Sequence, residues 1–329
     1  MKYVIIGTGN ISNTYVWAIA ELPDSAVVAG VSRSGRPLPA APDLPVYLDL
    51  EAVTEAFDAV IVATPNGLHC AGIIAAAKLG KHVLTEKPLG IRNEEMAEAL
   101  AACEAANVTL AVAYQRRTAP DNQVVKALIE KGALGNIFAA DLTAKFYRDQ
   151  AYYDSAEYRG GYAIDGGGPF IQQAAHNIDI YVWFFGLPEQ VVSMMGTFTH
   201  KMEAEDHGAA LLRFPNGMIG TIIASTSTKP GFAARLEVHS DKGSFTMIDD
   251  AITEWHFDDV PNPANSDFQY SHDGATSASV SDTSAHKQII TDFEQVIARG
   301  ETPIADGQSA QASSKLILDI YKSAVKQSS

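Results

Sequence analysis

The chain has 329 residues, 47% of them apolar and 19% charged, which is the composition of a globular protein long enough for two domains. Its 39 acidic and 24 basic side chains give a net charge of −15 without a local basic patch, so nucleic acid is not an expected partner. Two cysteines are too few for a disulfide framework and give no metal-ligand spacing, which predicts a reducing compartment and no metal.

The sequence also lacks the signals of membrane insertion and export. No apolar stretch approaches the roughly 20 residues that a membrane span needs. The apolar run at the N-terminus is too short for a signal peptide. We therefore expect a soluble, cytoplasmic protein with no membrane partner.

The first motif follows directly on a buried strand. Residues 3–6 are continuously apolar, which indicates a strand covered on both faces, and a helical pattern extends to about Glu21. Between them stands a dinucleotide fingerprint with serine in place of the third glycine, Gly7-Thr8-Gly9-Asn10-Ile11-Ser12. Its glycines allow a tight turn and let a pyrophosphate rest on the helix N-terminus. This context predicts a dinucleotide site, and a purely structural glycine turn is the alternative.

The end of the next strand bears on the choice of cofactor. Residues 26–31 are apolar and run into Ser32-Arg33-Ser34-Gly35-Arg36. An acidic residue here would bind the ribose hydroxyls of NAD, and none is present. Hydroxyl and guanidinium groups instead suit the 2′-phosphate of NADP. We predict NADP as the cofactor, and the alternative is a solvated basic loop with a relaxed or NAD preference.

Strands and helices alternate through the rest of the first half. After a proline-rich loop at 35–46, the pattern predicts strands at 59–63, 81–87 and 108–113, and helices at 70–79 and at 93–106 with Asn93 as its cap. Alternation with short connections is typical of a parallel, doubly wound sheet. Pro88 ends its strand and leaves Glu86 and Lys87 at the carboxyl edge, where open parallel sheets bind ligands.

The second half has the pattern of an antiparallel sheet. A helix to about residue 131 precedes a long strand over 137–147. Two hairpins are predicted, one with strands at 209–214 and 218–224 and one with strands at 235–239 and 244–248. Residues 258–283 lack periodicity, which predicts a long surface loop, and two helices over 284–299 and 309–326 end the chain.

A glycine-rich stretch over 159–169 leads into a second group of polar side chains. Pro169 is well placed to start a helix, on which Gln172, His176 and Asp179 would share one face. A lone helical histidine is more often structural than functional, so His176 does not predict a site without further support.

Two motifs together resemble a known family. Ala63-Thr64-Pro65-Asn66 with His69, then Gly80-Lys81-His82-Val83 with Glu86-Lys87-Pro88, is similar to the glucose–fructose oxidoreductase/inositol dehydrogenase/MocA (Gfo/Idh/MocA) family, over nearly the whole chain. The resemblance implies a Rossmann NAD(P)-binding domain over 1–117 and a substrate-binding and oligomerisation domain over 118–329 with a large, mostly antiparallel sheet. It also implies C-terminal helices that can pack back on the first domain, and a homodimer or homotetramer formed through the sheet.

The resemblance further implies hydride transfer between nicotinamide and a secondary alcohol or ketone of a sugar, inositol or nucleotide sugar. Lys87 is expected to stabilise the alkoxide, and His176 to exchange the proton because its ordinary pKa lies near neutrality. The family usually has an aspartate four residues before this histidine. Gln172 stands there and cannot take a proton, which leaves proton transfer to Lys87 and His176.

The expected site residues fall into groups. Lys87 and His176 are expected to be catalytic. Cofactor-binding residues are expected at Gly7, Thr8, Gly9, Asn10, Ile11, Ser32, Arg33, Ser34, Ala63, Thr64, Pro65, Asn66, His69, Glu86, Lys87 and Gln115. Substrate-binding residues are expected at Lys87, Tyr147, Arg148, Arg159, Gln172 and His176. His286, near the start of a C-terminal helix, is a further candidate for the pocket, and Asp179 is expected to support the site without touching substrate.

Two other functions stay open on the sequence. One is a redox-neutral sugar lyase or glycosidase that retains its nicotinamide. The other is a non-catalytic NADP-sensing regulator, against which the presence of both Lys87 and His176 argues. The sequence leaves open which sugar or polyol carbon reacts and in which direction.

Overall fold

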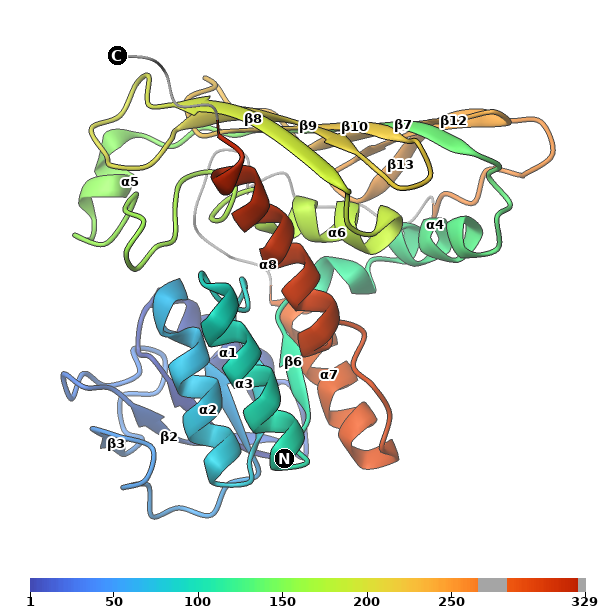
Figure 1. Ribbon diagram of the computed structural model, residues 1–329. Coiled ribbons are helices and arrows are strands. Elements are labelled where there is room, and N and C mark those ends of the chain that lie inside the picture. The colour runs from blue at the N-terminus through green and yellow to red at the C-terminus, as the bar shows by residue number, and fades with distance from the viewer. Residues whose placement is uncertain (266–282, 325–329) are drawn as a thin grey trace. The chain divides into compact units, whose positions relative to one another are not determined.

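The computed structural model describes residues 1–265 and 283–324 (Figure 1). The described chain forms two compact units. The first unit consists of residues 1–118 and 283–311. The second unit consists of residues 119–265 and 312–324. The sequence division placed its boundary after Arg117 and allowed the C-terminal helices to pack back on the first domain. In the structure, helix α7 (Ser284–Arg299) and the beginning of α8 (Gly307–Lys322) belong to the first unit.

The first unit is built on a six-stranded parallel sheet. Its strands are β1 (Lys2–Ile6), β2 (Ala26–Val31), β3 (Val46–Tyr47), β4 (Ala59–Val62), β5 (His82–Thr85) and β6 (Leu110–Val112). They lie in the order β3-β2-β1-β4-β5-β6 with every pair parallel. All of β4 is buried, as its continuous apolar sequence predicts for a parallel sheet covered on both faces. The predicted doubly wound sheet is confirmed.

Helices connect these strands and bring their carboxyl ends to one edge. They are α1 (Asn10–Ala20), α2 (His69–Lys78) and α3 (Asn93–Ala105), with the short 3₁₀ helices η1 (Asn66–Leu68) and η2 (Gln115–Thr118). α2 packs against α3, and α1 against α7. The strand order reverses between β1 and β4, so the loops after these strands lie where doubly wound folds bind ligands.

One local prediction in this unit was wrong. Asn93 is the first residue of α3 and not its cap, because the cap position belongs to Arg92, whose side chain makes no capping bond. The predicted proline-rich loop at 35–46 is confirmed except at its last residue, because 35–45 contain neither helix nor strand and β3 begins at Val46. Within this loop Leu38 pairs with Ala41 in an isolated bridge.

The second unit is built on a seven-stranded, mostly antiparallel sheet. Its strands are β7 (Ile137–Lys145), β8 (Gln190–Gly196), β9 (His207–Arg213), β10 (Ile219–Ser225), β11 (Arg235–Ser240), β12 (Gly243–Ile248) and β13 (Ala251–Phe257). They lie in the order β13-β12-β11-β7-β10-β9-β8, and only β7 and β10 pair in parallel. Both predicted hairpins, β9–β10 and β11–β12, are present.

Helices cover one face of this second sheet. Figure 1 shows α4 (Pro120–Glu130) and α6 (Ala175–Phe185) along the same face, and α5 (Gln150–Asp154) lies beyond β7 in the chain. β9 alternates buried and exposed side chains, as expected for a sheet with only one covered face. The uncovered face carries apolar side chains, among which Met194 is 66% and Leu211 54% exposed.

The helix expected from Pro169 starts later than predicted. Residues 169–174 form turns, and α6 begins at Ala175. The predicted loop over 258–283 lies partly outside the described residues, and its described part, 258–265, contains neither helix nor strand. Within the described chain, no helix combines the length and apolar character that a membrane crossing requires.

Candidate active site

The carboxyl edge of the first sheet depends on a backbone contact at Gly7. β1 ends at Ile6, and Gly7 has a φ of +99°, in the left-handed region that favours glycine. A Cβ atom built on Gly7 would lie 2.5 Å from the carbonyl oxygen of Ala63. Gly7 therefore lets the loop after β1 touch the loop after β4, and Thr8, which follows, is buried.

The N-terminus of α1 suits an anionic ligand. Gly9 is its cap residue and gives no side-chain capping bond, and the first turn contains no acidic residue. A Cβ atom on Gly9 would meet nothing within 4 Å, so a ligand can approach the backbone there. The N–H groups at this end, including those of Asn10 and Ile11, and the helix dipole both favour a phosphate group.

A basic turn follows β2 at the same edge of the sheet. Gly35 donates its backbone N–H to the Ser32 carbonyl at 2.9 Å, and the Ser32 and Ser34 hydroxyls lie 3.1 Å apart. Arg33 is exposed, and it forms no ion pair with any residue that the structure describes. Two hydroxyls and an exposed guanidinium are thus gathered where β2 ends.

Two shielded side-chain oxygens at this edge have no partner in the described chain. They are Thr64 Oγ1, after β4, and Gln115 Oε1, after β6. Shielded polar atoms are almost always hydrogen-bonded in folded proteins. Together with the open backbone at Gly9, these atoms fit a dinucleotide that would lie across the strand ends.

His69 connects two of the loops at this edge. Its Nδ1 lies 2.7 Å from the Pro88 carbonyl oxygen and its Nε2 lies 2.9 Å from the Thr64 carbonyl oxygen. Burial lowers the pKa of His69, and the two carbonyl groups oppose that effect. Both ring nitrogens are occupied by backbone, so this geometry makes His69 a link between the β4 and β5 loops. Pro65 and Asn66 lie between Thr64 and this histidine, at the start of η1.

A buried carboxylate lies immediately before Lys87. Glu86 Oε1 accepts a hydrogen bond of 2.8 Å from Tyr15, and Oε2 accepts one of 3.2 Å from the backbone N–H of Lys87. His286 Nε2 lies 3.7 Å from Oε1, at ion-pair distance but beyond a hydrogen bond. Burial raises the pKa of Glu86, but His286, Lys87 and Tyr15 together bring it below its ordinary value.

The predicted substrate residues all belong to the second unit except Lys87. Tyr147 follows β7, and its carbonyl oxygen accepts a 2.6 Å hydrogen bond from buried Arg148. The Arg159 guanidinium lies 4.4 Å from the centre of the Tyr152 ring, and Arg148 lies 5.7 Å from the same ring. Arg159 forms no ion pair with an acidic residue in the described chain. Two cations of the second unit therefore lie within 6 Å of the centre of one aromatic ring.

Gln172 and His176 do not share a helical face as predicted. Gln172 lies in the turns before α6, and its amide donates a 2.9 Å hydrogen bond to the Asp165 carbonyl oxygen. His176 is half-buried in the first turn of α6. Asp179, one turn further, is fully buried and accepts a 2.7 Å hydrogen bond from Ser313.

The glycine run before Pro169 is packed against side chains of its own unit. A Cβ atom on Gly167 would lie 2.3 Å from the Tyr321 hydroxyl, and one on Gly168 would lie 1.8 Å from the Glu205 carbonyl oxygen. Tyr321 donates a 2.9 Å hydrogen bond to Glu205 Oε1, and the Gly168 N–H donates one of 3.1 Å to Oε2. Because these glycines have no side chain, the backbone can pack closely around the buried Glu205 carboxyl group.

Sequence reasoning missed Tyr15, Tyr152, Glu205 and Tyr321. Each is a single residue inside an ordinary helix or loop pattern. The partners of Tyr15, Glu205 and Tyr321 are far away in the chain, and the partners of Tyr152, which are Arg148 and Arg159, are near but follow no regular spacing. The only signal was the glycine run at 166–168, which indicates that something approaches the backbone closely but not what.

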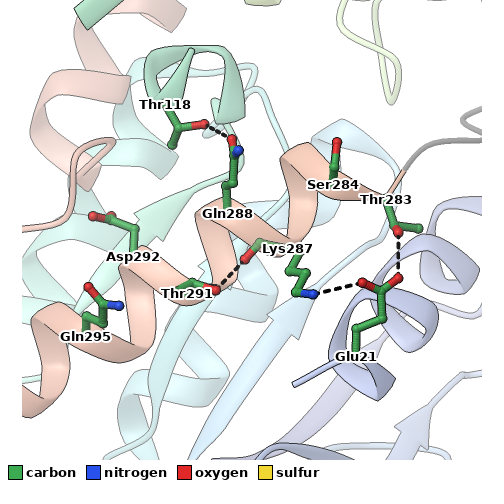
Figure 2. A pocket seen from close by; sticks show the side chains of 9 residues that line it. All are labelled: Glu21, Thr118, Thr283, Ser284, Lys287, Gln288, Thr291, Asp292 and Gln295. Atoms are coloured by element: carbon green, nitrogen blue, oxygen red, sulfur yellow. Dashed lines mark hydrogen bonds and ion pairs between the residues drawn. The ribbon is translucent and has the colours of Figure 1, made fainter. Parts of the chain in front are cut away.

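The first unit also contains a hollow along helix α7. It has a volume of about 590 Å³ and is lined mainly by one face of α7, including Lys287, Gln288 and Asp292. Figure 2 shows that Lys287 and Thr283 both bond to Glu21 across it. No residue predicted for the site lines this hollow, and Thr118 donates a 2.7 Å hydrogen bond to Gln288 within its lining.

The chain is similar to known proteins along both units. Residues 1–114 match the oxidoreductase family with an NAD-binding Rossmann fold, and residues 122–246 match the GFO/IDH/MocA C-terminal domain. The structure of WlbA dehydrogenase from Bordetella pertussis in complex with NADH and UDP-GlcNAcA is 30% identical, with a TM-score of 0.84 over 98% of this chain and 95% of that one.

The names of two curated relatives describe enzymes that act on a polyol or a sugar. scyllo-Inositol 2-dehydrogenase (NADP(+)) from Bacillus subtilis is 27% identical over 249 residues, which are 74% of this chain and 68% of that protein. D-Xylose 1-dehydrogenase (NADP(+)) 2 from Haloferax volcanii is 25% identical over 334 residues, covering 98% of this chain and 97% of that protein.

The buried Glu205 carboxyl group predicts a measurable pH dependence. Burial raises its pKa from 4.5 to about 7, so between these values the folded protein holds a proton that the unfolded chain has released. The stability that this proton contributes is full at acid pH and is lost as the pH rises through about 7. Glu205→Gln removes the titration. Its free energy of unfolding relative to wild type should therefore rise by roughly 2 kcal/mol between about pH 5 and about pH 8. Urea unfolding at several pH values measures the difference, and a difference independent of pH would contradict the prediction.

Proposed function

Because the chain belongs to the Gfo/Idh/MocA oxidoreductase family, we propose that it is an NAD(P)-dependent dehydrogenase or reductase of a sugar, inositol or nucleotide sugar. The observation that carries the proposal is the carboxyl edge of the first sheet. Thr64 Oγ1 and Gln115 Oε1 are shielded there without a partner in the described chain, and the N-terminus of α1 at Gly9 has no side-chain cap. This is a donor and acceptor set that a dinucleotide satisfies.

In the proposed reaction, Lys87 and His176 have different roles. Gly9, Thr64 and Gln115 would hold a nicotinamide dinucleotide, and that group would supply the acceptor or donor of the hydride for a secondary alcohol. Lys87, half-buried at the end of β5, donates a hydrogen bond to the substrate oxygen and stabilises the negative charge that develops on it. His176 takes up the hydroxyl proton during oxidation and gives it back during reduction. Gln172 cannot accept that proton, because its side chain is a carboxamide.

Ser32 and Arg33 support NADP as the preferred cofactor. Their hydroxyl and guanidinium groups, at the end of β2, suit a phosphate dianion better than two ribose hydroxyls. Relatives differ in this respect: the inositol and xylose enzymes have NADP(+) in their names, and WlbA was solved with NADH. The preference of this chain therefore depends on its own residues.

Arg159 favours a substrate with a negatively charged group. Its guanidinium stacks on Tyr152 and has no acidic partner in the described chain, and its Nε is shielded from solvent. Such a cation is stabilised by a carboxylate or phosphate of the ligand. WlbA, whose complex contains UDP-GlcNAcA, is a precedent for such a ligand in a similar fold. A substrate panel should therefore include sugar acids and nucleotide sugars beside inositols and free sugars.

The uncovered face of the second sheet supports assembly into a homodimer or homotetramer. Val192, Met194, Leu211 and Ile219, from three neighbouring strands, are 45% to 66% exposed. Contiguous exposed apolar side chains of this kind mark interaction surfaces. A second copy of the same face would bury them.

The first prediction from the proposed function concerns the 2′-phosphate of NADP. Arg33→Ala should weaken NADP binding roughly 10- to 100-fold, because a charge-assisted hydrogen bond to the phosphate is lost. NAD binding should stay as in wild type, since NAD has no phosphate at this position. Thermal unfolding with each cofactor titrated separately measures both affinities. Equal losses for the two cofactors would contradict a phosphate site.

The second prediction concerns Lys87. Lys87→Met should bind NADP nearly as wild type does but reduce turnover by about 10² or more, because the charge that stabilises the alkoxide is missing. The assay follows cofactor absorbance over the substrate panel, and Lys78→Met, at the end of α2, is the matched control. If Lys87→Met turned over like wild type, the assigned role would be wrong. Substrate conversion without net cofactor change would instead indicate a redox-neutral lyase or glycosidase.

The third prediction concerns assembly. Met194→Glu places a charge in the uncovered sheet face and should shift the protein to a monomer in sedimentation experiments. Leu48→Glu is the control, because Leu48 is 63% exposed in the first unit. An unchanged mass for Met194→Glu would exclude this face as the interface.

A further inference from the structure

Glu205 gathers hydrogen-bond donors from separate segments of the second unit. It lies close to the start of β9 and is 2% exposed. Oε1 accepts a 2.9 Å hydrogen bond from the Tyr321 hydroxyl on α8, and Oε2 accepts one of 3.1 Å from the Gly168 N–H. The backbone N–H of Phe170 and the hydroxyl of Tyr162 interact with the same carboxyl group. Glu205 forms no ion pair in the part of the chain that the structure describes, so these donors compensate its burial.

This set of groups suits a carboxylate better than a carboxylic acid. A carboxylate only accepts hydrogen bonds, whereas the acid has a hydrogen of its own to place. The Tyr321 oxygen already interacts with the Ile171 backbone N–H, which directs the hydroxyl hydrogen toward Glu205. Protonation of Glu205 would therefore weaken or break one of the bonds that the carboxylate accepts.

The segment that Glu205 holds leads directly into α6. The Gly168 carbonyl oxygen accepts a 3.1 Å hydrogen bond from the Gln172 N–H, and the Pro169 carbonyl oxygen accepts one of 2.8 Å from Ala174. Ala174 is the cap residue of α6, and His176 lies in its first turn with Nδ1 shielded from solvent. A movement at Gly168 is therefore passed along the backbone to Gln172 and His176.

We propose that Glu205 is a positioning residue for Gln172 and His176, and that Tyr321 keeps its carboxyl group directed at the backbone before α6. The carboxylate acts as an internal anion on the N–H groups of residues 168–171 and so fixes the two side chains that follow. The inference deepens the proposed function and rests on it for the roles of Gln172 and His176.

Glu205 is the titrating group of this network. Burial raises the pKa of both tyrosine hydroxyls, to about 12 at Tyr162 and further at Tyr321, so they stay neutral. The two acids next to Glu205 in the chain bind other groups: Glu203 is exposed and accepts a 3.2 Å hydrogen bond from the Tyr162 N–H, and Asp206 accepts bonds from the backbone of the loop before it.

Ionisation of Glu205 should affect the fold and the segment before α6 in opposite directions. Burial raises its pKa to about 7, so ionisation lowers the free energy of unfolding as the pH rises. The same ionisation strengthens the bonds to residues 168–171, because a charged acceptor binds N–H groups more strongly than a neutral one. This opposition separates a positioning role from a contribution to global stability.

The first test is hydrogen exchange of the protein without cofactor or substrate, read by mass spectrometry of the peptide over 167–172. At about pH 8.5 Glu205→Gln should exchange roughly five- to tenfold faster than wild type in this peptide, because its carboxamide is a neutral acceptor. At about pH 5.5, where wild type is protonated, the two proteins should exchange alike. A peptide from β10 should instead exchange more slowly in Glu205→Gln at the higher pH, since this variant avoids the cost of a buried charge.

Two further variants separate positioning from structural damage. Tyr321→Phe keeps Glu205 but removes the hydroxyl that directs it, and it should also speed exchange of the peptide over 167–172 at the higher pH. Glu203→Gln is the matched control, because Glu203 is an exposed neighbour that bonds to Tyr162 and not to the segment before α6. It should exchange like wild type in this peptide at both pH values.

The second test reads His176 itself. Diethyl pyrocarbonate labels imidazole nitrogens, and the reference in the same molecule is His256, whose side chain is 68% exposed. Release of the segment before α6 exposes the shielded Nδ1 of His176. Its labelling relative to His256 should therefore rise roughly three- to tenfold in Glu205→Gln at about pH 8.5 and stay as in wild type in Glu203→Gln.

Each outcome decides the inference. Faster exchange over 167–172 and faster labelling of His176 in Glu205→Gln support it. Exchange over 167–172 that is unchanged, or that slows together with β10, would overturn it, and so would unchanged labelling of His176. If Glu205→Gln does not fold, Tyr321→Phe decides by the same two readouts. Because neither test uses cofactor or substrate, a negative result leaves the proposed redox chemistry standing. Failure to bind any nicotinamide cofactor would instead remove the proposed function and leave this network intact.

Discussion

The backbone contact between Gly7 and Ala63 is the constraint on which the candidate site depends. A Cβ atom on Gly7 would lie 2.5 Å from the Ala63 carbonyl oxygen, so the loops after β1 and β4 meet at backbone distance only because one of them has no side chain. That contact fixes where α1 begins relative to Thr64. His69 then links the Thr64 and Pro88 carbonyl groups, which extends the same edge to the end of β5.

Two buried glutamates show how partners decide the charge of a carboxyl group. Burial raises the pKa of both. At Glu86 the effect is reversed, because His286, Lys87 and Tyr15 favour the ionised form. At Glu205 the partners are the Tyr321 hydroxyl and backbone N–H groups such as that of Gly168, and the pKa stays at about 7. A cation next to the carboxylate makes the difference between the two groups.

Most of the fold could be predicted from the sequence, but the side-chain contacts between residues distant in the chain could not. Continuous apolar runs, glycine turns and hairpin signals depend on neighbours in the chain, so they predicted the parallel sheet, both hairpins and α7 correctly. The helix expected from Pro169 failed because 169–174 follow a glycine run that is packed against Glu205 and Tyr321. The Tyr15–Glu86 bond joins residues 71 positions apart, and no local pattern marks such a pair.

Gln172 stands where the family usually has an aspartate, so the proposed chemistry depends more on Lys87 of the first unit. A carboxylate in that position could share a proton with His176, whereas the Gln172 amide donates to the Asp165 carbonyl oxygen. In the proposed mechanism, the groups that act on the substrate oxygen are then His176 and Lys87. In the mechanism that we propose, Lys87 stabilises the charge on that oxygen and His176 exchanges the proton, so a carboxamide at position 172 removes neither function.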